Sequence, residues 1–211
     1  FKIYNGEAEK FDTAIAVDCG DEGRIQSRLP LFSAAGMRLN IDHHITNTNY
    51  GDINFVVPEA AATAEIVFDL YKECCVPIDK EAANSLYAAI SGDTGGFRFQ
   101  NTTEKTHLIA AELIKSGAET ARISNELFER KSMGKIKLES AAINEMRIFH
   151  GGRTVICPIT ATLLEKLGAT DEETDSISGI LRGIDKVDAA VTLKEKNGVI
   201  KASMRTEEAV D

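Results

Sequence analysis

Short apolar runs alternate with helical spacings along the first part of the chain. Residues 13–17 and 36–39 are apolar runs that are too short for helices, so both predict buried strands. Residues 23–35 between them predict a helix with an irregularity at Leu29-Pro30. A strand, a helix and a second strand make a βαβ unit, which implies a parallel sheet.

Helical periodicity prevails between residues 61 and 149, after one extended piece at residues 53–57. The helix predicted at 81–91 is expected to begin at the cap Asp79 and to end at a glycine-rich turn, Gly92-Asp93-Thr94-Gly95-Gly96. Thr103 is expected to cap the helix predicted at 104–116. The predicted helices cover residues 61–74, 81–91, 104–116, 120–129 and 134–149.

The pattern changes to α+β near residue 149. A strand at 154–157 and helices at 160–167 and 174–181 precede a hairpin of residues 188–195 and 199–204. Asn197-Gly198 between those two runs is a strong hairpin signal. The predicted fold class is α/β. We expect a parallel-sheet domain at 1–131, a linker helix at 132–148 and a partial α+β domain at 149–211.

Composition and charge narrow the class of protein. The net charge is −9, from 33 acids and 24 bases, which argues against a non-specific binder of duplex DNA. No apolar run is long enough to span a bilayer and residues 1–6 lack signal-peptide character, so we expect no membrane partner and a cytoplasmic location. The four cysteines form no C-x-x-C pair, which favours free thiols in a reducing compartment.

Acids and imidazoles stand at the ends of three predicted elements. Asp18 follows the first strand, Asp42-His43-His44 follows the second, and Asp93 lies in the glycine-rich turn. Ligands of open α/β sheets bind at the carboxyl ends of the strands. Asp and His donors without Cys suit Mn or Mg better than structural zinc. Since neighbours on an extended chain point to opposite sides, the triplet is expected to supply a ligand, an orienting group and a substrate contact.

The order of these segments resembles the DHH phosphoesterase family, which is named for its Asp-His-His motif. Val17-Asp18-Cys19-Gly20-Asp21, Asp42-His43-His44 and Ser91-Gly92-Asp93-Thr94-Gly95-Gly96-Phe97 resemble its second, third and fourth motifs. Phe99-Gln100-Asn101-Thr102-Thr103 resembles the branch that degrades very short RNAs (nanoRNA) and dephosphorylates 3′-phosphoadenosine 5′-phosphate. Lys201-Ala202-Ser203-Met204-Arg205-Thr206 resembles the family's C-terminal substrate domain, DHHA1.

The resemblance implies roles for individual residues. Asp18 would bridge two metal ions, and His43 and Asp93 would bind the second ion. His44 would contact phosphate or support its neighbours, and Asp42 would orient them, so that all five residues belong to the catalytic site.

Substrate contacts are implied for two arginines. Arg205 resembles a substrate-domain residue that grips a terminal phosphate, a role that suits a guanidinium group. Arg98 follows the glycine-rich turn closely and is a second candidate for substrate contact.

The implied activity is that of a Mn-dependent phosphoesterase and exoribonuclease. It would hydrolyse short oligonucleotides or 3′-phosphoadenosine 5′-phosphate with water activated by two metal ions. Two alternatives stay open: a pyrophosphatase or polyphosphatase of the same superfamily, and a metal-poor module that binds nucleotides without turnover.

Two departures from the family pattern qualify these expectations. The family's first motif and its glycine-rich His motif have no counterpart in the sequence, which begins at Phe1. We therefore expect a fragment that lacks both ends of the catalytic apparatus, holds one ion or none, and is nearly inactive alone. An unpaired sheet edge or a homodimer would accompany the loss of a first strand.

Overall fold

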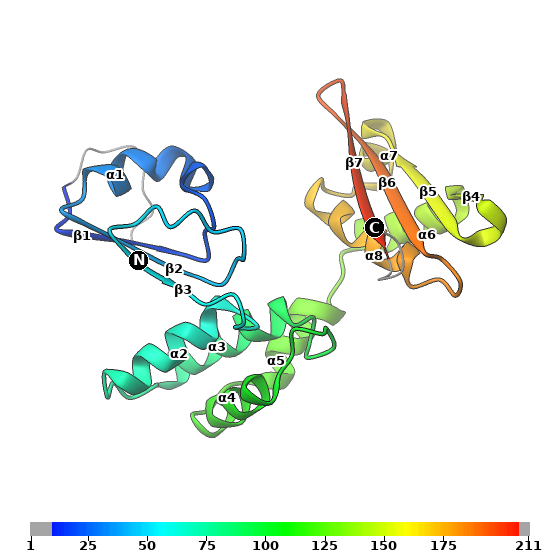
Figure 1. The fold of residues 1–211 in the computed structure, drawn as a ribbon. Coiled ribbons are helices and arrows are strands. Elements are labelled where there is room, and N and C mark those ends of the chain that lie inside the picture. The colour runs from blue at the N-terminus through cyan, green and yellow to red at the C-terminus, as the bar shows by residue number, and fades with distance from the viewer. Residues whose placement is uncertain (1–9, 207–211) are drawn as a thin grey trace. The chain divides into compact units, whose positions relative to one another are not determined.

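The structure is a computed structural model that describes residues 10–206 of the chain. The chain divides into two compact units, Phe1–Arg130 and Lys131–Asp211. Figure 1 draws the first unit from blue to green and the second from yellow-green to red. Within the described residues, no helix is both long enough and apolar enough to cross a bilayer.

The first unit contains the predicted parallel sheet, with strand order β1-β2-β3 (Figure 1). Its strands are β1 (Thr13–Val17), β2 (Met37–Asp42) and β3 (Ile53–Val56). The register pairs Val17 of β1 with Ile41 of β2. Because parallel strands run in the same direction, the residues that follow β1 and β2 emerge side by side at one edge of the sheet.

The connection between β1 and β2 differs from the single helix predicted there. Residues Glu22–Arg28 form short 3₁₀ turns with a kink at Gln26, where φ is +53°, and α1 (Leu29–Ala34) follows them. Pro30 stands in the first turn of α1, where the missing N–H of proline has no helical partner to lose. The proline therefore starts a new helix rather than bending one long helix.

Four helices complete the first unit. They are α2 (Thr63–Glu73), α3 (Lys80–Asp93), α4 (Glu104–Lys115) and α5 (Thr120–Ser124), which a π-helical turn extends over Asn125–Glu129. The predicted caps are confirmed: Asp79 accepts a hydrogen bond from Ala82 N, and Thr103 forms a capping box with Thr106.

The end of α3 corrects one prediction. The helix continues through Gly92 and includes Asp93 as its last residue, so Asp93 does not lie in a turn. Ile90 and Ser91 are buried, and their packing offsets the cost of about 1 kcal/mol for a glycine in a helix. The chain turns after Asp93, with positive φ at Gly95 (+57°), Gly96 (+71°) and Phe97 (+63°).

The second unit is a mixed four-stranded sheet with order β4-β5-β6-β7 (Figure 1). Its strands are β4 (Arg147–Phe149), β5 (Thr154–Ile159), β6 (Ala189–Lys196) and β7 (Val199–Thr206), and its α-helices are α6 (Met133–Glu145), α7 (Ala161–Leu167) and α8 (Ile177–Arg182). The predicted hairpin is confirmed. Asn197 and Gly198 join β6 to β7, and both have positive φ.

Helix α6 differs from the predicted linker helix. It ends at Glu145, and Arg147–Phe149 then pairs with β5 as strand β4. Leu138 and Ala142 of α6 are buried in the same core as Val155 and Leu181. Because this apolar face has packing partners in the second unit, α6 is part of that unit's core and not a free connection.

The contact of α6 with the loop after α7 predicts a stability change. A Cβ atom at Gly134 would overlap the carbonyl oxygen of Gly168. Gly134→Ala is expected to destabilise the second unit by about 1–3 kcal/mol, because the backbone has to shift. Gly179→Ala in α8 is the control: nothing lies within 4 Å of that position, so a gain of about 0.5–1 kcal/mol is expected.

Hydrogen exchange of the second unit's amides, followed by mass spectrometry, measures both changes. All four tyrosines lie within residues 1–130, so tyrosine fluorescence reports on the first unit and serves as an internal reference. Equal protection in the two variants would contradict the close packing at Gly134.

Candidate metal centre

Asp18 stands directly after β1 in a backbone conformation that is uncommon for an acid. Its φ is +58°, in the left-handed region. Its N–H donates to Ile41 O at 3.0 Å, which holds the residue against the end of β2. The hydroxyl of Thr63 donates to Asp18 Oδ1 at 2.8 Å, while the side chain stays 52% exposed. Asp18 is thus both fixed and accessible.

The two histidines of the triplet face Asp18 from the end of β2. His43 Nδ1 lies 3.1 Å from Ala60 O, and its Nε2 lies 3.7 Å from Asp18 Oδ1 and 3.6 Å from Asp93 Oδ2. His44 Nδ1 lies 4.0 Å from Asp18 Oδ1. One imidazole nitrogen of His43 is therefore turned toward two carboxylates that come from different elements.

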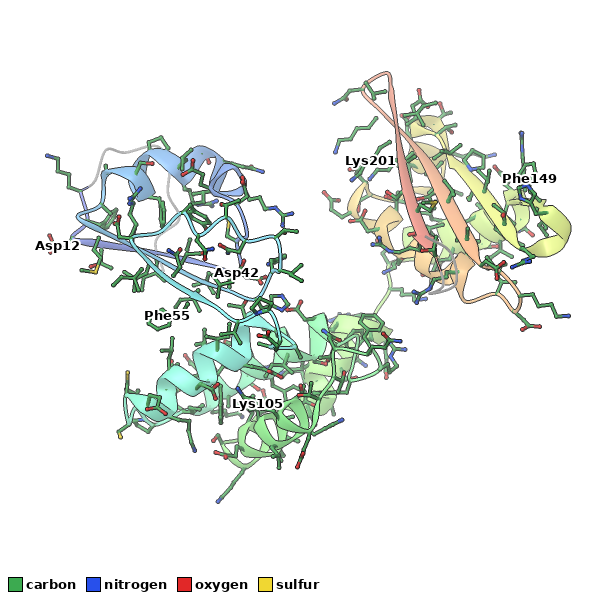
Figure 2. All side chains as sticks on the ribbon, viewed as in Figure 1. Asp12, Asp42, Phe55, Lys105, Phe149 and Lys201 are labelled. Carbon is green, nitrogen blue, oxygen red and sulfur yellow. The ribbon has the colours of Figure 1, made fainter. Side chains whose placement is uncertain are left out.

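Asp42 does not join them at the surface, because its side chain is fully buried (0% exposed). Figure 2 shows Asp42 where the strands of the first unit meet its helices. Its Oδ1 lies 2.7 Å from His44 Nδ1, and its Oδ2 accepts from Asn47 Nδ2 at 2.5 Å. Burial raises the pKa of Asp42, but the hydrogen bonds with His44 and Asn47 outweigh it and leave this pKa below its usual value.

A buried amide, Asn40, connects the ends of the two strands. Its Nδ2 lies 3.2 Å from Cys19 O and 3.1 Å from the hydroxyl of Tyr50, and its Oδ1 accepts from Asn47 at 2.7 Å. The hydroxyl of Tyr50 also donates to Cys19 O at 2.8 Å. These bonds fix the loop that follows Asp18 relative to Asp42.

Asp93 reaches the group from the C-terminal end of α3. Burial and the nearby carboxylate of Asp18 raise the pKa of Asp93, although His43 and His44 partly oppose this. Asn101 Nδ2 donates to Asp93 O at 3.2 Å and to Ala61 O at 3.0 Å. Burial is the larger cause of the raised pKa of Asp93, and the negative charge of Asp18 adds to it.

The donors present fit a divalent cation. Asp18, His43 and His44 each offer one ligand atom, and these atoms lie within 4.8 Å of one another. Asp93 adds a carboxylate whose Oδ2 lies 3.6 Å from His43 Nε2. Oxygen and imidazole donors without thiolate suit Mn or Mg, and a cation would relieve the repulsion between the two acids.

The two arginines occupy different surroundings. Arg98 Nε donates to Gly95 O at 2.6 Å, and its guanidinium lies 5.8 Å from the centroid of the Phe128 ring. Arg205 lines a polar cavity of about 400 Å³ in the second unit. The cavity is also lined by Lys194, Lys201, Thr192, Ser203, Thr174, Ser178 and Asp175.

Sequence reasoning missed Asn40, Asn47, Tyr50 and Thr63. Asn40 had a readable signal, since it is a polar residue between Leu39 and Ile41 in an apolar strand. The others make contacts with Asp18, Asp42 and the loop after β1 that only the folded chain brings together.

The buried amide network predicts a loss of stability. Asn40→Ala leaves Asn47 without one acceptor and Cys19 O without one donor, so the first unit is expected to lose about 1–3 kcal/mol. Asn125→Ala, an exposed asparagine of the same unit, is the control, with an expected change within about 0.5 kcal/mol. Urea unfolding followed by tyrosine fluorescence measures both, and equal midpoints would show that the network is not stabilising.

Two curated proteins resemble this chain in sequence over nearly all of its length. The chain is 30% identical over 209 residues to the bifunctional oligoribonuclease and PAP phosphatase NrnA of Bacillus subtilis, an alignment that covers 98% of the chain and 66% of the relative. The NrnA protein of Thermus thermophilus is 32% identical over 206 residues, with coverage of 96% and 60%. The chain therefore spans about 60–66% of the length of these two relatives.

A solved structure shows the same fold. An exopolyphosphatase-related protein from Bacteroides fragilis superposes with a TM-score of 0.84 at 23% identity, covering 93% of this chain and 58% of that one. Residues 3–90 match the DHH family, N-terminal domain, and this segment contains Asp18 and the Asp42-His43-His44 triplet. The chain belongs to the DHH family.

Proposed function

We propose that the protein is a metal-dependent phosphoesterase that acts on short oligoribonucleotides and on 3′-phosphoadenosine 5′-phosphate. The observation that carries the proposal is the convergence of Asp18, His43 and Asp93, with Nε2 of His43 within 3.7 Å of both carboxylates. The names of the two NrnA relatives support the choice of substrates. RNA fragments arise where RNA is turned over, so the proposal includes a cytoplasmic location.

The proposed ligands are Asp18, His43 and Asp93, and the proposed ion is Mn²⁺. Divalent cations, when bound, polarise a phosphoryl oxygen and make a bound water a better nucleophile. His44, which lies between Asp42 and Asp18, would contact the phosphate at this centre. Asp42 would hold His44 in place through the 2.7 Å contact with Nδ1.

The second unit supplies a phosphate contact in this proposal. Arg205 shares its cavity with Lys194 and Lys201, and the neighbouring hydroxyls of Thr192 and Ser203 are neutral donors. This lining is basic and polar, which suits a phosphate group. Arg98, which is exposed and follows the glycine-rich turn, stays a second candidate for substrate contact, and its Nε also donates to Gly95 O.

Titration calorimetry with Mn²⁺ tests the metal site on the 211-residue chain. Asp18→Ala and Asp93→Ala are each expected to weaken binding by at least about tenfold, because each variant removes a negatively charged oxygen donor. Asp69→Ala is the matched control, since Asp69 is a surface acid of the same unit that pairs with Lys105 at 2.6 Å. Equal affinity in all four proteins would contradict the assignment of the ligands.

Hydrolysis assays test the activity on the natural protein that contains these residues. Asp18→Ala is expected to lower turnover of a diribonucleotide and of 3′-phosphoadenosine 5′-phosphate by about 10³-fold, as loss of electrostatic stabilisation at a phosphoryl centre does. Pyrophosphate and polyphosphate are the competing substrates. Faster release of phosphate from either of them would replace the proposed activity with that of a pyrophosphatase or polyphosphatase.

A further inference from the structure

We propose that Thr63 is a positioning residue that holds the carboxylate of Asp18 ready for the metal ion. The inference rests on the proposed function, because it concerns the same centre. The geometry that carries it is the 2.8 Å hydrogen bond from Thr63 Oγ1 to Asp18 Oδ1, made across 45 residues of sequence.

Asp18 needs an external support for its side chain. Its backbone is held in the left-handed region, with φ at +58°, by its hydrogen bond with Ile41 O. The carboxylate is 52% exposed, and a surface side chain ordinarily samples several rotamers. The contacts of Asp18 Oδ1 with His43 and His44 are long, at 3.7 and 4.0 Å, so the Thr63 hydroxyl makes the short hydrogen bond.

Thr63 is well suited to orient a partner, because it is itself immobilised. The residue is 3% exposed, and a β-branched side chain has few accessible rotamers. Thr63 is the first residue of α2, where the positive end of the helix dipole favours a nearby carboxylate. The N-cap residue of α2 is Ala62, which makes no side-chain cap hydrogen bond. The hydroxyl of Thr63 donates to Asp18 instead of to the start of its own helix.

The segment before α2 is fixed by three side chains. Ala61 N donates to Glu65 Oε2 at 3.2 Å, Asn101 Nδ2 donates to Ala61 O at 3.0 Å, and His43 Nδ1 lies 3.1 Å from Ala60 O. The same buried segment therefore orients His43 through Ala60 and presents Thr63 to Asp18. The start of α2 therefore orients two proposed ligands, Asp18 after β1 and His43 after β2.

Thr63→Val separates positioning from packing, because valine keeps the shape and removes the hydroxyl. Asp18 Oδ1 belongs to a half-exposed carboxylate that water can reach, so the midpoint of urea unfolding is expected to stay near that of the wild type. The Mn²⁺ dissociation constant is expected to rise about tenfold, the lower end of the range for residues that orient metal ligands. Thr63→Ser keeps the hydroxyl and is expected to restore the affinity to within about threefold of the wild type.

Thr106→Val is the matched control. Thr106 is also a buried threonine of the first unit, but its hydroxyl belongs to the capping box of α4. This variant is expected to lower the unfolding midpoint, because a cap is lost, and to leave the Mn²⁺ affinity unchanged. Calorimetry and tyrosine fluorescence on the full 211-residue chain provide both readouts.

The outcomes distinguish this inference from the proposed function. Weaker Mn²⁺ binding in Thr63→Val, with recovery in Thr63→Ser, supports the positioning role. Wild-type affinity in Thr63→Val overturns it and leaves the metal site intact. Equal loss of affinity in Thr63→Val and Thr63→Ser also overturns it, because the hydroxyl is then not the cause. A wild-type chain that binds no Mn²⁺ overturns the metal site itself and this inference with it.

Discussion

The parallel pairing of β1 with β2 is the constraint on which the centre depends. The register places Val17 beside Ile41, so Asp18 and Asp42-His43-His44 leave the sheet at adjacent points. A shift of one residue would move every side chain of a strand to the opposite face of the sheet. Asn40 and Ile41 would then change faces, and both the amide network and the contact of Ile41 with α2 would be lost. Strand packing and site geometry are therefore set by the same register.

The acids of the candidate metal centre differ in their burial. Asp42 is fully enclosed, and it is satisfied by His44 and Asn47. Asp18 and Asp93 stay accessible, and their mutual repulsion contributes to the raised pKa of Asp93. A buried carboxylate needs hydrogen bonds to offset the cost of its burial, whereas accessible acids that repel one another are available to a cation. The proposed metal site uses the accessible acids Asp18 and Asp93 as ligands, and the buried Asp42 holds His44 in place.

The features of the fold that could be predicted from the sequence are those that depend on neighbouring residues. The strands predicted at 13–17 and 36–39, the caps Asp79 and Thr103, and the Asn197-Gly198 turn depend on neighbours in the sequence, and the structure contains all of them, although the second strand extends to Asp42. The end of α3 was predicted too early, because Gly92 signals a stop and the packing of Ile90 and Ser91 overrides it. Thr63 and Asn101 act on residues far away in sequence, so no local pattern marks them. Likewise, α6 belongs to the second unit because Leu138 and Ala142 are buried in that unit's core, which no local pattern shows.

The proposed metal centre requires that Asp18, His43 and Asp93 bind the same ion. Anomalous diffraction from crystals grown with Mn²⁺ tests it most directly, since it locates the ion without reference to activity. An anomalous peak is expected at coordination distance from Asp18, from Nε2 of His43 and from Asp93. A peak at another group of acids, or no peak at these residues in crystals that contain Mn²⁺, would contradict it.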